Sequence, residues 1–146
     1  MYFVDTNIFL RHLTRDDPVK AAACFALLQA AQRNEVQLTT SESVIAEIVF
    51  ILSSPRLYGL AREEIAARLR PILQLPGLKV THRSTYLRAL DLFVRHRVDF
   101  EDALTVAHME RQGMRELYSY DRDFDAVETV TRHEPAHDAR TGNHDP

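Results

Sequence analysis

The sequence has little cysteine, glycine and lysine, and it has no tryptophan. Among 146 residues there are one cysteine (Cys24), four glycines, six prolines and two lysines. A single cysteine excludes an intramolecular disulfide framework and favours a reducing compartment. The low glycine and proline content excludes collagen-like and low-complexity chains. With 45% hydrophobic and 27% charged residues, the composition is typical of one globular domain.

Long apolar runs are also missing. The longest one, Ala21–Leu28, is much shorter than the roughly 20 residues that span a bilayer. Met1 is followed directly by Tyr2–Asp5, without the basic segment and apolar stretch of a secretory signal. We therefore expect a cytoplasmic protein.

The charge distribution is more informative than the net charge of -3, which gives no support to a strongly basic nucleic-acid binder. Sixteen of the eighteen basic residues are arginine, a side chain that binds phosphate through paired hydrogen bonds. Four arginines against the single acid Asp91 lie between His82 and Val98. This pattern fits either a phosphate-binding helix or an ordinary solvated helix face.

Short apolar segments alternate with longer amphipathic ones along the chain. Strands are predicted at Tyr2–Val4, Val36–Thr39, Leu78–Val80 and Leu117–Ser119, with a fifth at the sheet edge at Val127–Thr131. Helices are predicted at 6–13, 18–33, 40–52, 62–73, 84–96 and 101–112. This alternation predicts an α/β fold with a mainly parallel sheet of four to five strands.

Local signals set several of these boundaries. Asp17 before Pro18 is a helix start, Thr39 with Glu42 is a possible capping box, and Gly113 suits a helix end. From Arg132 onward almost nothing can be buried, which predicts a tail. The domain is therefore expected at 1–135 and a flexible C-terminal tail at 136–146.

Four carboxylates stand out by their expected positions. Asp5 and Asp121 follow the first and fourth strands, whose carboxyl ends meet at one edge of a parallel sheet. Glu47 lies in the otherwise apolar helical segment Val44–Leu52, where an ionised side chain needs a partner. Asp102 falls in the first turn of its helix, where the macrodipole favours a negative charge. Capping or turn formation is a sufficient explanation for Asp5, Asp102 and Asp121 taken singly, whereas no local cap explains Glu47.

Together the four acids favour a metal centre. Two such charges at close range repel by about 4 kcal/mol at an effective dielectric constant near 20, so a cluster needs protons or cations. Oxygen ligands select Mg²⁺ or Mn²⁺ over Zn²⁺. These ions activate water and stabilise the oxygens of phosphodiester displacement, which is the chemistry of a nuclease.

Four segments in this order resemble the PIN domain family, and within it the VapC toxins of bacterial type II toxin–antitoxin pairs. They are Phe3–Asn7, Val44–Ile48, Val98–Leu104 and Ser119–Phe124, and the resemblance extends from Tyr2 to about Pro135. It implies a three-layer α/β/α sandwich and a Mg²⁺-dependent endoribonuclease, with Mn²⁺ as an alternative ion. It also implies an RNA substrate, a homodimer and a small cognate VapB-like antitoxin.

The resemblance also implies roles for individual residues. Asp5, Glu47, Asp102 and Asp121 correspond to the catalytic, metal-holding carboxylates. Auxiliary positions are the acids Asp99 and Asp123 and the hydrogen-bonding residues Thr6, Asn7 and Ser119. For RNA contacts the candidates are Arg88, Arg95, Arg97 and Arg122.

A zinc-protease signal is the main competing motif. His133–His137 reads H-E-x-x-H, which binds zinc when a stable helix places both histidines on one face. Here Pro135 interrupts the motif and the surrounding sequence is polar, so we reject it. The remaining histidines His12, His82, His96 and His108 have no acid beside them at metal-ligand spacing.

Two other functions fit the same pattern less well. The first is a PIN nuclease for RNA processing that has no antitoxin; a neighbouring small reading frame for an antitoxin would separate it from a toxin. The second is a phospho-accepting receiver module, which also gathers acids and Mg²⁺ on a parallel sheet. A receiver needs a lysine after a late strand, but Lys20 and Lys79 are the only lysines and neither is near Asp121.

Overall fold

The computed structural model describes residues 1–136, in which helices and short strands alternate along the chain. In chain order the elements are β1 (Tyr2–Phe3), α1 (Thr6–Thr14), α2 (Pro18–Gln32), β2 (Leu38–Thr39), α3 (Glu42–Ser53), α4 (Arg62–Leu73), α5 (Arg83–Arg95), α6 (Phe100–Arg111), β3 (Glu116–Tyr118), the 3-10 helix η1 (Arg122–Ala126) and β4 (Thr131–His133).

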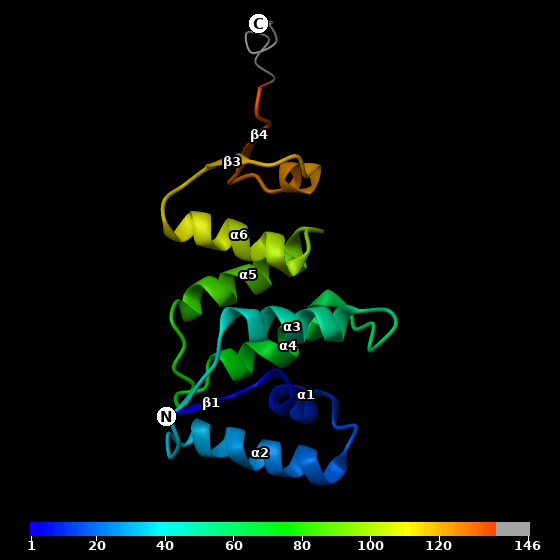
Figure 1. Cartoon of the computed structure of the whole chain (residues 1–146), viewed down its shortest axis with the longest axis vertical. Helices are drawn as coiled ribbons and strands as arrows, with labels where there is room; N and C mark the ends of the chain where they lie inside the picture. The colour runs from blue at the N-terminus through cyan, green and yellow to red at the C-terminus, as the bar shows by residue number, and fades with distance from the viewer. Residues whose placement is uncertain (137–146) are drawn as a thin grey trace, which may run out of the picture.

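The helices are stacked along the long axis of the molecule (Figure 1). β1, α1 and α2 lie at one end, α3, α4 and α5 lie in the middle, and α6 lies next to the unit formed by β3, η1 and β4. Successive helices in this stack contact one another, with α5 packed on both α4 and α6. The element that carries Asp102 is therefore held by the helices, whereas Asp121 lies in the terminal unit.

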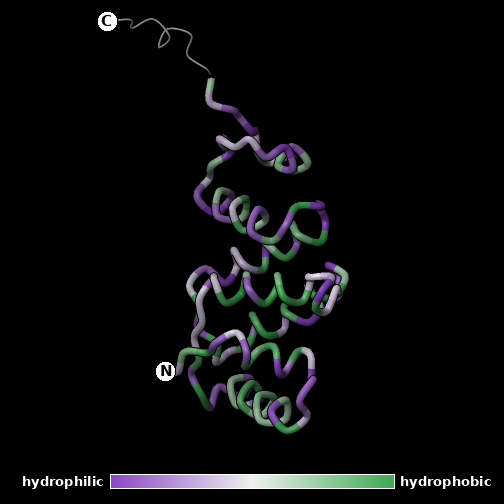
Figure 2. Tube along the Cα trace, turned by 45° about the vertical axis from the view of Figure 1, so that its right-hand side comes forward, coloured by the Kyte–Doolittle hydropathy of each residue, from purple (hydrophilic) through white to green (hydrophobic). Residues whose placement is uncertain are grey.

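The hydrophobic core runs through the middle of the stack. Most of its largest fully buried side chains come from α3, α4 and α5, and Phe9 of α1 and Leu38 of β2 join them. Figure 2 shows hydrophobic positions concentrated along the helices of this region. Among the helices at 1–136, none is long and apolar enough to cross a membrane.

The strands are parallel, which confirms the α/β class, but the sheets are small. β1 pairs with β2, and a single bridge from Leu38 to Leu78 marks the predicted third strand. β3 pairs with β4 in a second two-stranded sheet. The strands contain only two or three residues each, so the expected sheet of four to five strands is divided into two pairs.

Three local predictions differ from the structure. Ser41, and not Thr39, caps α3, because Thr39 pairs with Phe3 in the sheet and stays extended. His82, in the left-handed region at φ 61°, is the N-cap of α5 in place of Ser84. The last strand lies at 131–133, just after the predicted 127–131.

The predicted start of a tail at Arg132 is also wrong, because Arg132 and His133 belong to β4. Paired backbone and polar contacts hold this segment, so it does not depend on burial of apolar side chains. The proposed flexible tail at 136–146 lies, apart from Ala136, outside the described residues.

Candidate metal centre

Three carboxylates converge where α6 meets the segment after β3. One oxygen each from Asp102, Asp121 and Asp123 lies within 4.8 Å of the other two. Asp102 is on the first turn of α6, Asp121 is the N-cap of η1, and Asp123 is within η1. We call these three side chains the acidic triad.

The start of α6 fixes Asp102. Asp99 caps the helix, and its Oδ1 accepts a 2.8 Å hydrogen bond from the backbone N–H of Asp102. Partial burial raises the pKa of Asp102 to about 6, and the negative charges of Asp99, Asp121 and Asp123 add to this effect. The metal-free site therefore resists placing a full negative charge on Asp102.

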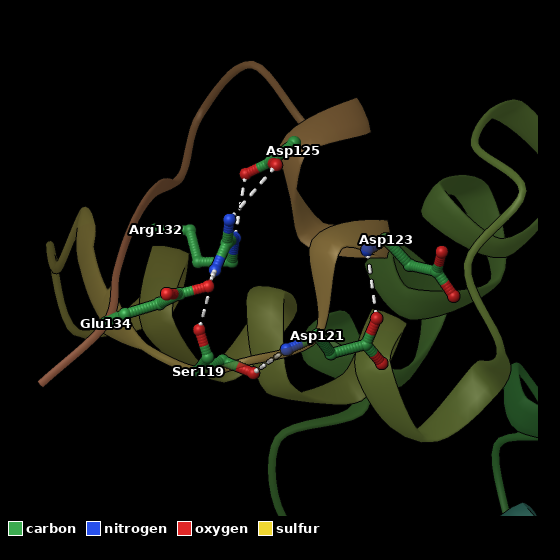
Figure 3. A network of polar contacts seen from close by, with 6 residues as sticks. All are labelled: Ser119, Asp121, Asp123, Asp125, Arg132 and Glu134. Atoms are coloured by element: carbon green, nitrogen blue, oxygen red, sulfur yellow. Dashed lines mark hydrogen bonds and ion pairs between the residues drawn. The ribbon is translucent and has the colours of Figure 1, made fainter.

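A hydrogen-bonded turn fixes the other two members of the triad (Figure 3). The N–H of Asp121 donates to Ser119 Oγ at 3.0 Å, and the N–H of Asp123 donates to Asp121 Oδ1 at 2.9 Å. Ser, Asp and Asn side chains favour such turns because their oxygens reach backbone donors two residues away. The sequence S-x-D-x-D thus folds locally so that both carboxylates face α6.

Asp5 and Glu47 belong to a second polar cluster. Asp5 caps α1 by accepting a 2.8 Å hydrogen bond from the N–H of Thr6. The buried hydroxyl of Thr6 donates to Glu47 Oε2 on α3, also at 2.8 Å. Since β1 and β3 belong to different sheets, Asp5 and Asp121 do not share one sheet edge as the sequence predicted. Neither Asp5 nor Glu47 is part of the acidic triad.

The environment of Glu47 differs from the apolar surroundings that its helix pattern suggested. Glu47 is exposed, and Phe50, one turn further along α3, is 69% exposed. A cavity of about 590 Å³ lies between this part of α3 and the start of α6, and its lining includes Phe50, Asp99 and Glu101. This cavity lies between the helix that carries Glu47 and the helix that carries Asp102.

The remaining candidates lie in different settings. Asn7 is exposed on α1. Arg88 forms a bidentate ion pair with Glu110: its Nε lies 2.7 Å from Oε2, and its Nη2 lies 3.1 Å from Oε1. Its guanidinium is therefore already engaged. Arg95, Arg97 and Arg122 are exposed and make no ion pair with any residue at 1–136.

The histidines at 1–136 stay outside the acidic triad. His133 lies in β4, a strand, and its Nε2 is 2.7 Å from Glu116 Oε2. His137, the other histidine of the H-E-x-x-H match, lies outside the described residues. His108 contacts Glu42. A helical zinc motif is therefore contradicted at His133.

Sequence reasoning missed Arg132. Its side chain is only 12% exposed, and its guanidinium contacts Asp125, Glu134 and the carbonyl of Ser119. The opposite charges of Asp125, Arg132 and Glu134 were the signal in the sequence that could have indicated these contacts. The polar composition after Val130 indicated a tail instead.

The donor set of the acidic triad fits a hard divalent cation. Carboxylate oxygens are the preferred ligands of Mg²⁺ and Mn²⁺, and a cation relieves the repulsion that raises the pKa of Asp102. Among the residues at 1–136, no cysteine or histidine joins the group, which disfavours zinc.

Carboxylates gathered between a helix start and a post-strand turn of an α/β domain form the kind of site that holds the divalent cations of metal-dependent phosphodiesterases. The family model described as the PIN domain matches residues 2–130, and the chain therefore belongs to the PIN domain family. PIN domains are generally metal-dependent nucleases. No curated protein matches the chain.

Proposed function

We propose that this protein is a Mg²⁺-dependent endoribonuclease that acts as the toxin of a type II toxin–antitoxin pair and is inhibited by a small VapB-like antitoxin. The observation that carries the proposal is the acidic triad within a PIN domain. Its setting is cytoplasmic, where both messenger RNA and transfer RNA are available.

Each residue of the triad has a defined task in this proposal. Asp102, Asp121 and Asp123 hold a divalent cation through their carboxylate oxygens. A bound Mg²⁺ or Mn²⁺ lowers the pKa of a coordinated water and neutralises charge on the phosphodiester. Asp99 keeps Asp102 oriented through the cap of α6, and Ser119 keeps Asp121 oriented through its hydroxyl.

The second cluster acts on the substrate side of the same site. Asp5 and Glu47 provide further carboxylates, with Thr6 holding Glu47 by its 2.8 Å hydrogen bond and Asn7 presenting an exposed amide beside them. The cavity between α3 and α6 has Asp99 and Glu101 in its lining. An RNA phosphate bound beside these two acids needs a cation to offset their negative charge.

Exposed arginines provide the attraction for RNA. Arg95, Arg97 and Arg122 are the candidates, because Arg88 is neutralised by Glu110. The loop after α3 is the proposed surface for a homodimer partner or antitoxin, because Leu57 is 58% exposed there. Tyr58 in the same loop contacts Asp16 and so supports the loop shape.

The test is cleavage of a defined RNA pool with Mg²⁺, with and without EDTA, followed by mapping of the new ends. Asp102→Asn and Asp121→Asn should each slow cleavage by about 100-fold or more, because loss of a direct ligand exceeds the effect of removing a supporting residue. The matched control is Asp91→Asn, which removes a carboxylate from an exposed ion pair with Arg70. Undiminished cleavage by both site variants would contradict the proposal.

A toxin and an RNA-processing enzyme of the same family share this chemistry. Growth arrest on expression, relieved by the product of an adjacent small reading frame, supports the toxin role. Cleavage without any such partner supports the processing role.

A further inference from the structure

Arg132 ties together the whole unit that carries Asp121 and Asp123. Its Nε lies 3.0 Å from Asp125 Oδ1, and its Nη1 lies 2.8 Å from Glu134 Oε1. The same Nη1 donates a 2.9 Å hydrogen bond to the backbone carbonyl of Ser119 (Figure 3). One guanidinium, on a side chain that is only 12% exposed, thus joins the segment after β3, η1 and the residue after β4.

Ser119 transmits this contact to the acidic triad. Its carbonyl accepts from Arg132, and its hydroxyl accepts from the N–H of Asp121. Asp121 in turn accepts from the N–H of Asp123. A series of contacts therefore leads from Arg132 through Ser119 to the Asp121 carboxylate and to the backbone N–H of Asp123.

No buried apolar side chain lies within the turn from Ser119 to Asp123 that carries the two carboxylates. η1 has five residues, and Phe124 is its only buried one. β3 is mostly exposed. With few buried contacts, the directions of the Asp121 and Asp123 carboxylates depend on the polar network. A planar guanidinium suits the task, because its five N–H groups reach two carboxylates and a carbonyl at the same time.

We propose that Arg132 is a positioning residue for the metal centre: it fixes the turn at Ser119 so that Asp121 and Asp123 converge on Asp102. The inference rests on the proposed metal-dependent function and adds a residue that contacts no member of the triad directly. It predicts that Arg132 determines cation affinity through geometry.

Charge alone predicts the opposite sign. Arg132 carries a positive charge close to a cation site, and removing it would tighten cation binding if only Coulomb repulsion mattered. A positioning role predicts weaker binding when Arg132 is removed. The direction of the change therefore separates the two explanations.

The experiment compares Mn²⁺ dissociation constants of the full chain and its variants, measured by electron paramagnetic resonance of free Mn²⁺. Arg132→Met should weaken Mn²⁺ binding by about 10-fold or more, the usual effect of losing a residue that orients metal ligands. Arg132→Lys should weaken it less, since an ammonium reaches Ser119 or one carboxylate but not all three acceptors. The concentration of Mg²⁺ required for half-maximal RNA cleavage should rise in parallel.

The matched control is Arg68→Met. Arg68 also donates to a backbone carbonyl, that of Leu13 at 2.9 Å, and to a carboxylate, that of Glu64 at 2.7 Å. It lies on α4, in the middle of the stack and away from β3 and β4. This variant should lose similar contacts and keep the wild-type Mn²⁺ affinity.

Unchanged or tighter Mn²⁺ binding by Arg132→Met, with its circular dichroism spectrum intact, overturns the inference. If Arg132→Met does not fold, Arg132→Lys decides, and wild-type affinity in that variant overturns it as well. Failure of the proposed function has a different result: the wild-type protein binds Mn²⁺ at this centre, with the expected Arg132 dependence, but cleaves no RNA.

Discussion

The hydroxyl of Thr6 donates a 2.8 Å hydrogen bond to Glu47 Oε2, joining the start of α1 to α3 across 41 residues of sequence. Thr6 is only 4% exposed, and its backbone N–H also binds Asp5. One buried residue therefore connects two of the acids that sequence reasoning assigned to the site. The backbone N–H of Thr6 holds the Asp5 carboxylate and its hydroxyl holds the Glu47 carboxylate, so the relative position of the two acids is fixed.

Thr6→Val tests the role of this contact. Valine keeps the shape of threonine but cannot donate, so Glu47 loses its orientation and RNA cleavage should fall by about 10-fold. Because Glu47 is exposed, water replaces the lost donor, and the free energy of unfolding should change by no more than about 1 kcal/mol. Thr6→Ser retains the donor and should cleave near the wild-type rate. Equal rates for the valine and serine variants would show that the contact has no part in the activity.

The pKa of Asp102 predicts how stability depends on pH in metal-free protein. Its value is about 6 in the folded protein and 3.8 without the fold. Between these two values the folded state holds a proton that the unfolded state has lost, so the free energy of unfolding falls as pH rises from about 4 to about 6. Above pH 6 the Asp102 contribution is constant.

Asp102→Asn should lack this component. Urea unfolding in EDTA at several pH values from 4 to 7 gives the free energy of unfolding of the wild-type protein and of the variant. The difference between the two proteins measures the Asp102 component, because the contributions of the other groups cancel. Salt should reduce the part that comes from Asp99, Asp121 and Asp123, because the site is partly open to solvent. Mg²⁺ at pH 7 should stabilise the wild-type protein more than the variant. Parallel pH curves for the two proteins would contradict the assignment.

Asp121→Asn should separate stability from activity. The substitution removes one negative charge from the triad, and asparagine can still accept from the N–H of Asp123 through Oδ1. Metal-free protein at pH 7 should therefore be more stable by about 0.5 kcal/mol, while cleavage falls by about 100-fold or more. Asp91→Asn, which loses an exposed ion pair with Arg70, should show no gain in stability and normal cleavage. A destabilised Asp121→Asn protein would mean that repulsion does not dominate the metal-free site.

Local signals allowed the helices to be predicted from sequence. Asp17 with Pro18 begins α2, Asp99 begins α6, and Gly113 follows α6 at φ 70°. Each signal depends on atoms within a few residues, so it is visible in the sequence. The choice between Ser41 and Thr39 as the cap of α3 depended on pairing with β1, which no local pattern encodes.

The pairing of strands and the exact composition of the site needed the structure. β1 and β2 pair across 36 residues, and two-residue strands carry almost no periodic signal. The S-x-D-x-D turn placed Asp123 beside Asp121 through short-range hydrogen bonds, but its meeting with Asp102 depends on how η1 is placed against the start of α6. Arg132 was missed because three polar acceptors, and not apolar neighbours, hold its side chain in place.

Two glycines give a final test of how packing and backbone conformation support the fold. Gly77 N–H donates to Ala31 O at 2.8 Å, and its carbonyl accepts from Leu38 N–H at 2.7 Å. A Cβ at this position would lie 2.7 Å from Ala31 O and 2.8 Å from Ala31 Cα, and it would also meet the carbonyl of Val36. All three neighbours are backbone atoms, so residue 77 must move away from the end of α2 and from Val36 to admit a methyl group.

Gly77→Ala should therefore lower the free energy of unfolding by about 3 kcal/mol, as overpacking of a fixed core does. Gly113→Ala is the matched control, because its Cβ would meet nothing within 4 Å and only its positive φ is unfavourable. That variant should lose about 1 kcal/mol. Urea unfolding of both proteins measures the difference. The free energy of unfolding could instead fall less for Gly77→Ala than for Gly113→Ala. That result would mean that the packing between α2 and β2 is loose. Other contacts would then have to support β1 and Asp5.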